Sequence, residues 1–245
     1  MKIHPQSKHS IKPRKMKNYF FEFFVIFIAI IGGFFADNIR ERFIDRHAVK
    51  EYMVSLVQDL KADTMDLSQK LLLNKNLING LDSLQNTMEK PLIGDNLKKF
   101  YQYNLQYTVK YHPFMPTNRT IVQLMNTGGL RLIKKKIVSD SIIIYDQTKI
   151  AAQLMGEFLG NQISDIIDEE AEIIDVLAFV KSSSASNIQN DFPALLTSDN
   201  KTISSYYFKI IVLHGTLQTY YLSLEELKKQ ATFLIHQIEK EFKVE

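Results

Sequence analysis

The sequence predicts an all-α protein, with one transmembrane helix that continues into an amphipathic stalk and is followed by a bundle of long helices. A single long apolar run lies near the amino terminus, and apolar residues elsewhere recur at helical spacing. No stretch shows the sustained alternation of apolar and polar residues that is typical of strands. The chain has 245 residues and no internal repeat, so it is long enough to bury a sizeable core in one domain.

The apolar run extends from Phe20 to Ala36, and Tyr19 lengthens it by one residue. A helix over residues 19–36 would be about 27 Å long, close to the ~30 Å thickness of bilayer hydrocarbon. Lipid offers no partner to backbone polar groups, so such a run is stable there only as a helix, and we predict a transmembrane helix. The alternative is a cleaved signal peptide, but the run is long for one, and Phe34 fits poorly in a cleavage site that ends at Ala36.

Basic residues are concentrated before this span. Residues 1–18 contain six Lys or Arg and no acidic residue, which leaves 24 of the 30 basic residues and all 27 acidic residues in the remainder. Because Lys and Arg favour the cytoplasmic side, we predict a cytoplasmic tail over 1–18 and a domain outside the cytoplasm over 37–245. The tail is expected to contact anionic lipid headgroups and no nucleic acid, because it is tethered to the bilayer and lacks aromatic residues.

Glu22 is the one charged residue of the span. A carboxylate in hydrocarbon is costly, so one interpretation is an intramembrane polar contact with another subunit or partner. The other interpretation is that Glu22, one turn inside the interface, reaches headgroups or a basic residue such as Lys15. The adjacent pair Gly32 and Gly33 does not form the small-xxx-small pattern of close helix pairing.

The predicted stalk covers residues 37–90. Neither Pro nor Gly occurs between Asp37 and Asn74, and the apolar residues keep a broken 3.5-residue rhythm. This stripe could pack onto later helices of the same chain, or it could form a homo-oligomeric coiled coil. Pro91 and Gly94 then end the helical pattern.

Two shorter helices are predicted before the bundle. Asp95 is expected to cap a helix over residues 97–105, and the two prolines in 112–116 predict a rigid connector. Thr117 or Asn118 is then expected to cap a short helix.

Two long helices complete the predicted domain. Gly128 and Gly129 are expected to end the preceding short helix, because a left-handed residue is needed there. The long helices are predicted at about 136–180 and 202–242, and the polar residues 181–201 between them predict an exposed loop.

Few residues are candidates for chemistry. The absence of Cys excludes thiolate metal sites, redox pairs and cysteine nucleophiles. The acidic residues of 165–175 are a candidate di-metal site, but no His follows a Glu by three positions, so we expect a solvated acidic face with neither metal nor cofactor.

His214 is expected to be a core or half-buried histidine that is hydrogen-bonded across the bundle. No hydrolase, zinc-protease or phosphate-loop motif is present, so we expect no enzyme.

A second basic cluster consists of Arg131, Lys134, Lys135 and Lys136. It is a candidate contact for an anion or an acidic partner. The alternative is a solvated connection, which is the commoner role of such a run.

Two blocks of the sequence have a familiar pattern. In the first, Glu22 leads an apolar span that ends in Ala36-Asp37-Asn38-Ile39-Arg40-Glu41, and Leu56-Val57-Gln58-Asp59-Leu60 follows in the stalk. The second block runs from Thr120 to Lys134 and contains a Leu-x-x-x-Gly-x-Leu-x-Leu-Ile pattern. Both resemble an uncharacterised family, a domain of unknown function, of bacterial single-span membrane proteins.

The resemblance implies an architecture and no catalytic residue. It implies that Gly128, Gly129 and Leu130 form a structural corner, where a short helix turns into a long one. We therefore expect a non-enzymatic, single-pass protein of the bacterial cytoplasmic (inner) membrane whose helical domain serves protein interaction or assembly. The expected partners are the lipid bilayer and either a second copy of the chain or another membrane or periplasmic protein. The alternative function is a ligand-sensing domain that signals through a partner protein.

Overall fold

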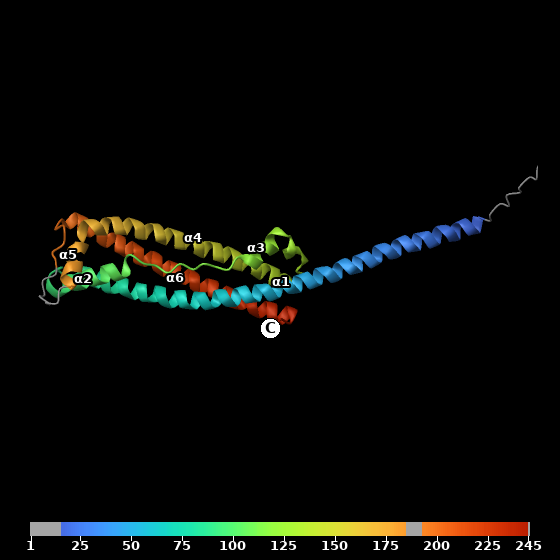
Figure 1. The fold of residues 1–245 in the computed structure, drawn as a ribbon, viewed down its shortest axis with the longest axis horizontal. Coiled ribbons are helices and arrows are strands. Elements are labelled where there is room, and N and C mark those ends of the chain that lie inside the picture. Colours follow the sequence, from blue (N-terminus) through green and yellow to red (C-terminus); the bar gives the residue numbers. More distant parts are fainter. Residues whose placement is uncertain (1–15, 185–192, 245) are drawn as a thin grey trace, which may run out of the picture. The chain divides into compact units, whose positions relative to one another are not determined.

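A computed structural model of the chain describes residues 16–184 and 193–244. Within these ranges it contains six α-helices, one 3-10 helix and no β-strand, which confirms the all-α class (Figure 1). The chain divides into two compact units, Met1–Val49 and Lys50–Glu245, which are described separately below.

Helix α1, Met16–Met88, is uninterrupted across the predicted span and stalk. Its end at Met88 agrees with the expected stop before Pro91. In the second unit Met53, Leu60 and Leu67 of α1 are fully buried, so this part of the apolar stripe packs onto later helices of the same chain. In the first unit the two earliest members of the stripe, Ile39 and Phe43, are exposed.

Helix α2, Gly94–Tyr107, has the expected position but a different amino-terminal cap. Ile93 is the capping residue and offers no side-chain acceptor, whereas Asp95 lies inside the first turn. The prediction that Asp95 caps this helix is therefore wrong. Its carboxylate is placed to interact with the positive end of the helix dipole instead.

Helix α3, Arg119–Asn126, is followed by the 3-10 helix η1, Gly129–Leu132. Asn118 is the residue before α3, as expected, yet its side chain makes no capping hydrogen bond. The predicted connector over 112–116 is non-helical in the structure.

Helices α4, Lys136–Ile173, and α5, Val176–Ser184, replace the single helix predicted over 136–180. Ile174 is extended, with φ −105° and ψ 121°. The next residue, Asp175, accepts a hydrogen bond from the backbone N–H of Ala178 at 2.8 Å, and this bond caps α5.

Tertiary contact explains the break between α4 and α5. The ring of Phe179 in α5 stacks on that of Tyr101 in α2, with centroids 5.2 Å apart. The Tyr101 hydroxyl accepts from the backbone N–H of Asp175 and donates to the carbonyl of Ala194, both at 3.3 Å. A straight continuation of α4 would forfeit this packing, and a local helical pattern carries no information about it.

Helix α6, Asn200–Phe242, agrees with the predicted helix over 202–242. Asp199 caps it by accepting from the backbone N–H of Thr202 at 2.9 Å. Of the predicted loop over 181–201, residues 193–199 are irregular, 181–184 belong to α5, and 185–192 lie outside the described residues.

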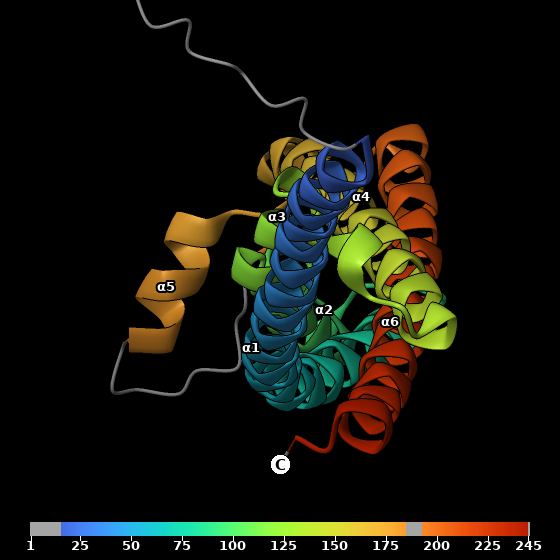
Figure 2. The same ribbon diagram turned by 90° about the vertical axis from the view of Figure 1, so that its right-hand side faces the viewer.

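Helices α4 and α6 pack side by side along their length (Figures 1 and 2). The pairs Lys135–Glu241 and Lys209–Glu169, at 2.7 and 2.6 Å, set an antiparallel register. Between them Gly156 lies against the ring of Tyr220, where an added Cβ would stand 3.3 Å from the nearest ring atom. Small residues at such a contact allow two helices to approach closely.

Four tyrosines are among the largest fully buried side chains, and each hydroxyl has a partner (Tyr101, Tyr145, Tyr206, Tyr220). A buried tyrosine needs such a partner, because its hydroxyl has lost water. The Tyr220 hydroxyl, for example, accepts from the backbone N–H of Phe114 at 2.9 Å. The bonds of Tyr101 and Tyr220 join irregular segments to helices, and those of Tyr145 and Tyr206 join one helix to another.

Candidate functional site

The apolar part of α1 has the properties of a membrane span. It is the one helix, among the described residues, that is long and apolar enough to cross a membrane, and none of its apolar window is buried. Every side chain from residue 19 to 36 is exposed, including that of Glu22. A run of large apolar side chains that the protein itself leaves uncovered is consistent with a lipid environment.

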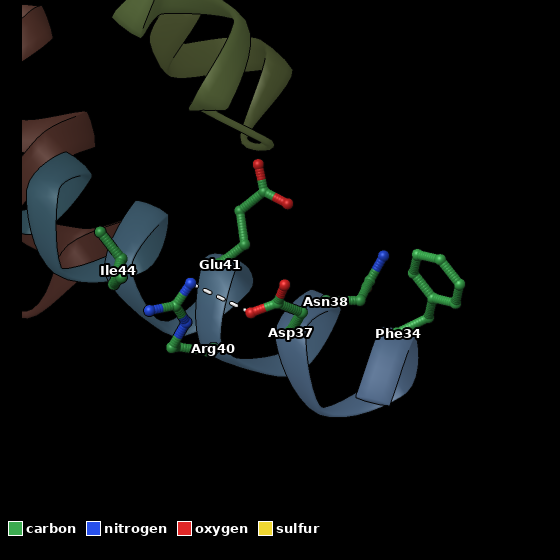
Figure 3. Close-up of a pocket in the computed structure, with 6 residues that line it drawn as sticks. All are labelled: Phe34, Asp37, Asn38, Arg40, Glu41 and Ile44. Atoms are coloured by element: carbon green, nitrogen blue, oxygen red, sulfur yellow. Dashed lines mark ion pairs between the residues drawn. The ribbon is translucent and has the colours of Figure 1, made fainter. Parts of the chain in front are cut away.

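A hollow lies at the end of this apolar part, on α1 alone. It is lined by residues of one stretch of helix (Phe34, Asp37, Asn38, Arg40, Glu41, Ile44). Figure 3 shows the ion pair in it, in which the Arg40 guanidinium is 3.0 Å from the Asp37 carboxylate. Both side chains are more than two-thirds exposed, so solvent screens the pair, and one face of one helix does not enclose a ligand.

Asp59 of α1 supplies the cap that α3 lacks in its own sequence. One carboxylate oxygen accepts from the backbone N–H of Thr120 at 3.2 Å and from the Thr120 hydroxyl at 2.5 Å. The other oxygen is 2.7 Å from the guanidinium of Arg119. Because a helix begins with unpaired N–H groups and a partial positive charge, this buried carboxylate stabilises the start of α3 from a distant part of the chain.

Asp63 lies one turn further along α1 and has a parallel role. Its carboxylate accepts from the backbone N–H of Thr117 at 2.9 Å and from the hydroxyl of Tyr145 in α4 at 2.8 Å. Burial and the nearby Asp63 carboxylate raise the pKa of the Tyr145 hydroxyl well above its ordinary value, so it remains a donor. Asp59 and Asp63 together join α1, the start of α3 and α4, and we name this pair the aspartate junction.

The predicted corner lies beside the aspartate junction. Gly128 has φ 69°, the left-handed conformation expected for the end of the short helix. Gly129 is buried, and an added Cβ would stand 3.4 Å from the ring of Tyr52 in α1. Leu130 is half-buried. The corner and the aspartate junction therefore both lie against α1, the first beside Tyr52 and the second through the bonds of Asp59 to Thr120.

The second basic cluster is exposed at all four positions, Arg131, Lys134, Lys135 and Lys136. Lys135 forms the ion pair with Glu241 described above, and this pairing lowers the pKa of the Glu241 carboxyl. One of the four candidate contacts for an anion or partner therefore has a role within the fold, where it joins the start of α4 to the end of α6.

Of the acidic residues of 165–175, Asp165, Asp168 and Glu172 are exposed, as the sequence predicted, but Glu170 is not. Glu170 is buried, and one of its oxygens accepts from the hydroxyl of Thr108, the residue that follows α2, at 2.9 Å, while the other has no hydrogen-bond partner. Burial raises the pKa of the Glu170 carboxyl, and the hydrogen bond from Thr108 offsets this only in part. Sequence reasoning missed this residue because its partners lie on another helix.

Two histidines have structural partners. His214 is mostly buried, and its Nε2 is 3.0 Å from the carboxylate of Asp82 in α1, as expected for a histidine bonded across the bundle. His112 is held through its backbone, where the N–H and carbonyl bond the side-chain amide of Asn74 at 3.2 and 3.0 Å. Partial burial and two nearby lysines lower the pKa of the His112 ring.

The clearest polar arrangement in the second unit is therefore the aspartate junction, whose carboxylates accept hydrogen bonds from groups that build the fold. Within the described ranges, no group of three or more His, Asp or Glu side chains is placed to hold a metal ion.

Comparison of the chain with protein families, with curated proteins and with solved structures gives no match.

Proposed function

We propose that this chain is a non-enzymatic, single-span protein of the bacterial cytoplasmic membrane that presents its helical domain outside the cytoplasm for protein interaction or assembly. The observation that carries the proposal is the uncovered apolar helix of residues 19–36. Burial of one large apolar side chain is worth about 1.5–3 kcal/mol, so hydrocarbon is a far better solvent than water for this segment.

The orientation rests on the basic tail. Six Lys or Arg precede the span within 18 residues and no acidic residue accompanies them. Retention of such residues in the cytoplasm directs the second unit to the other side. The resemblance to bacterial single-span proteins supports the same topology.

The non-enzymatic character rests on the roles of the buried polar groups. Asp59 accepts from Thr120 at the start of α3, and Asp63 accepts from Thr117 and from Tyr145 in α4, so these bonds hold α3 and α4 against α1. Groups that are already paired in this way serve assembly of the fold, which favours a domain that acts by presenting a surface.

Two aspartates in the span test the anchor. Ile28→Asp combined with Ile31→Asp should cost about 5–7 kcal/mol of membrane insertion, enough to release the full chain from membranes. The matched control pairs Ile39→Asp with Phe43→Asp, because these residues are at least as exposed on α1 but follow the predicted span. Extraction of membranes at alkaline pH should release only the first variant. Retention of both variants in the membrane pellet would contradict the placement of the span.

A further inference from the structure

Buried polar side chains from three helices meet around Glu170. Asn104 of α2, Thr108 after it, Glu170 of α4 and Tyr206 of α6 are all buried. The Tyr206 hydroxyl donates to Oδ1 of Asn104 at 2.7 Å. The Thr108 hydroxyl lies 2.7 Å from the backbone carbonyl oxygen of Asn104 and 2.9 Å from Oε2 of Glu170. We name these four residues the Glu170 cluster.

The two contacts of the Thr108 hydroxyl need two protons. Both distances lie in the range of direct O–H···O hydrogen bonds. A hydroxyl has a single proton to donate, and a backbone carbonyl oxygen can only accept. An ionised Glu170 can also only accept, so Thr108 would have to donate to it, and its contact with Asn104 would join two oxygens with no proton between them. A protonated Glu170 removes this conflict, because it donates to Thr108 while Thr108 donates to Asn104.

The other oxygen of Glu170 supports the same protonation state. This atom, Oε1, is buried and has no hydrogen-bond partner. An ionised carboxylate would place part of its negative charge there, and a buried charge without a hydrogen bond or a counter-ion is costly. A neutral carboxyl group avoids that cost.

The ionisable groups around Glu170 do not neutralise its charge. Lys209 of α6 pairs with Glu169 of α4 at 2.6 Å and not with Glu170. Burial raises the pKa of the Tyr206 hydroxyl well above its ordinary value, so this group stays neutral, and its proton is given to Asn104. Asn104 and Thr108, which face Glu170 from the end of α2, carry no charge.

We propose that Glu170 is a proton-binding site of the folded chain, and that its proton holds the end of α2 against α4. The O–H group at Oε2 donates to Oγ1 of Thr108, and the Thr108 hydroxyl donates to the carbonyl of Asn104. Burial, which raises the pKa of the Glu170 carboxyl, acts in the same direction. The inference concerns the second unit alone and does not depend on the membrane anchor.

Loss of this proton to solvent should loosen the contact. Thr108 must then turn its own proton to the carboxylate, and the Asn104 carbonyl loses the hydroxyl as a donor. The charged carboxylate is more stable in water, so the chain should open more often between α2 and α4. With a raised folded-state pKa, the equilibrium constant of this opening should rise up to about tenfold per pH unit, until the pH reaches that pKa.

Infrared difference spectroscopy of the full chain in detergent tests the proton directly. At about pH 5.5, carboxyls of ordinary pKa are mostly ionised. The spectrum of the unaltered chain minus that of Glu170→Gln should contain the C=O band of a protonated carboxyl group, which shifts in D2O. Glu172→Gln, at an exposed position of α4, is the matched control and should give mainly the bands of an ionised carboxylate. Carboxylate bands without the C=O band for Glu170→Gln would overturn the proposal.

Hydrogen exchange tests the contact between the helices. Exchange of the α2 amides, corrected for the intrinsic effect of pH, is measured from about pH 5 to about pH 7.5 in both chains. The opening constant should rise in the unaltered chain and stay level in Glu170→Gln, because an amide N–H can donate to Thr108 at every pH. Parallel pH profiles in the two chains would overturn the role of the proton in holding α2, whatever the infrared result.

Discussion

Asp59 shows how one buried carboxylate can define a fold at the level of a residue. It bonds the start of a helix 61 positions away in the sequence, and it does so in place of the local cap expected at Asn118 or Thr117. Its neighbour Asp63 bonds Thr117 and Tyr145, so both acids act between elements. These two carboxylates of an amphipathic helix are thus the polar contacts that join α1 to the start of α3 and to α4.

Removal of the Asp59 carboxylate should destabilise the folded chain. Asp59→Ala leaves the buried Thr120 N–H and hydroxyl without their acceptor, so we expect a loss of about 2–3 kcal/mol in the free energy of unfolding. Chemical denaturation of the detergent-solubilised chain, followed by circular dichroism, measures this loss. Asp66→Ala is the control on the same helix, since its partner Lys70 is 3.9 Å away and both are partly exposed. Equal losses in the free energy of unfolding for the two variants would contradict the capping role of Asp59.

Glu170 should make the stability depend on pH. Its folded-state pKa is raised above the ordinary 4.5, so the folded carboxyl holds its proton more tightly than the unfolded one. The contribution of Glu170 to the free energy of unfolding is therefore greatest below about pH 4.5, and it falls as the pH rises through the folded-state pKa.

Replacement by an amide should remove that dependence. The Tm of Glu170→Gln, relative to that of the unaltered chain, should rise between acidic and neutral pH, as measured by thermal melts across this range. Glu172→Gln, at an exposed position of the same helix, should show no such trend. Parallel pH profiles for the chain and Glu170→Gln would show that Glu170 does not titrate differently on folding.

At the level of elements, helices with long regular patterns were predictable and their ends were less so. The uninterrupted α1 and the length of α6 follow from apolar periodicity, and Pro91 marks the end of α1, whereas the Asp199 cap of α6 was not predicted. The break at Ile174 was not predictable, because it depends on Tyr101 from α2, which contacts Asp175 and Phe179. Periodicity reports one face of a helix, whereas such breaks depend on contacts made elsewhere.

The corner between α3 and α4 gives a prediction for an element. Gly128→Val places a β-branched residue at φ 69° and should cost about 1–2 kcal/mol or more, whereas Gly128→Asn should cost less because Asn tolerates this conformation. Gly215→Ala is the control glycine, since it lies within a helix with open space around its Cβ, and it should gain about 0.5–1 kcal/mol. Melting temperatures of the three variants measure this order. An unchanged value for Gly128→Val would refute the corner role.

At the level of the whole molecule, the sequence was sufficient for the class and for the candidate span, but not for the polar contacts within the bundle. The apolar run at 19–36 is a local property and needs no tertiary information. The burial of Glu170 and the bonds of Asp59 depend on partners more than 60 positions away. The acidic run at 165–175 was therefore interpreted as a solvated face although one of its members lies in the core.

The central claim, a membrane anchor with the helical domain outside the cytoplasm, can be tested with one thiol. Met65→Cys provides a single exposed cysteine in the second unit of a chain that otherwise has none. Intact spheroplasts are treated with a membrane-impermeant maleimide, and their membranes are then extracted at alkaline pH. A membrane anchor with the domain outside the cytoplasm should give a labelled chain in the membrane pellet before any lysis. Labelling only after lysis, or recovery of the chain in the alkaline supernatant, would contradict it.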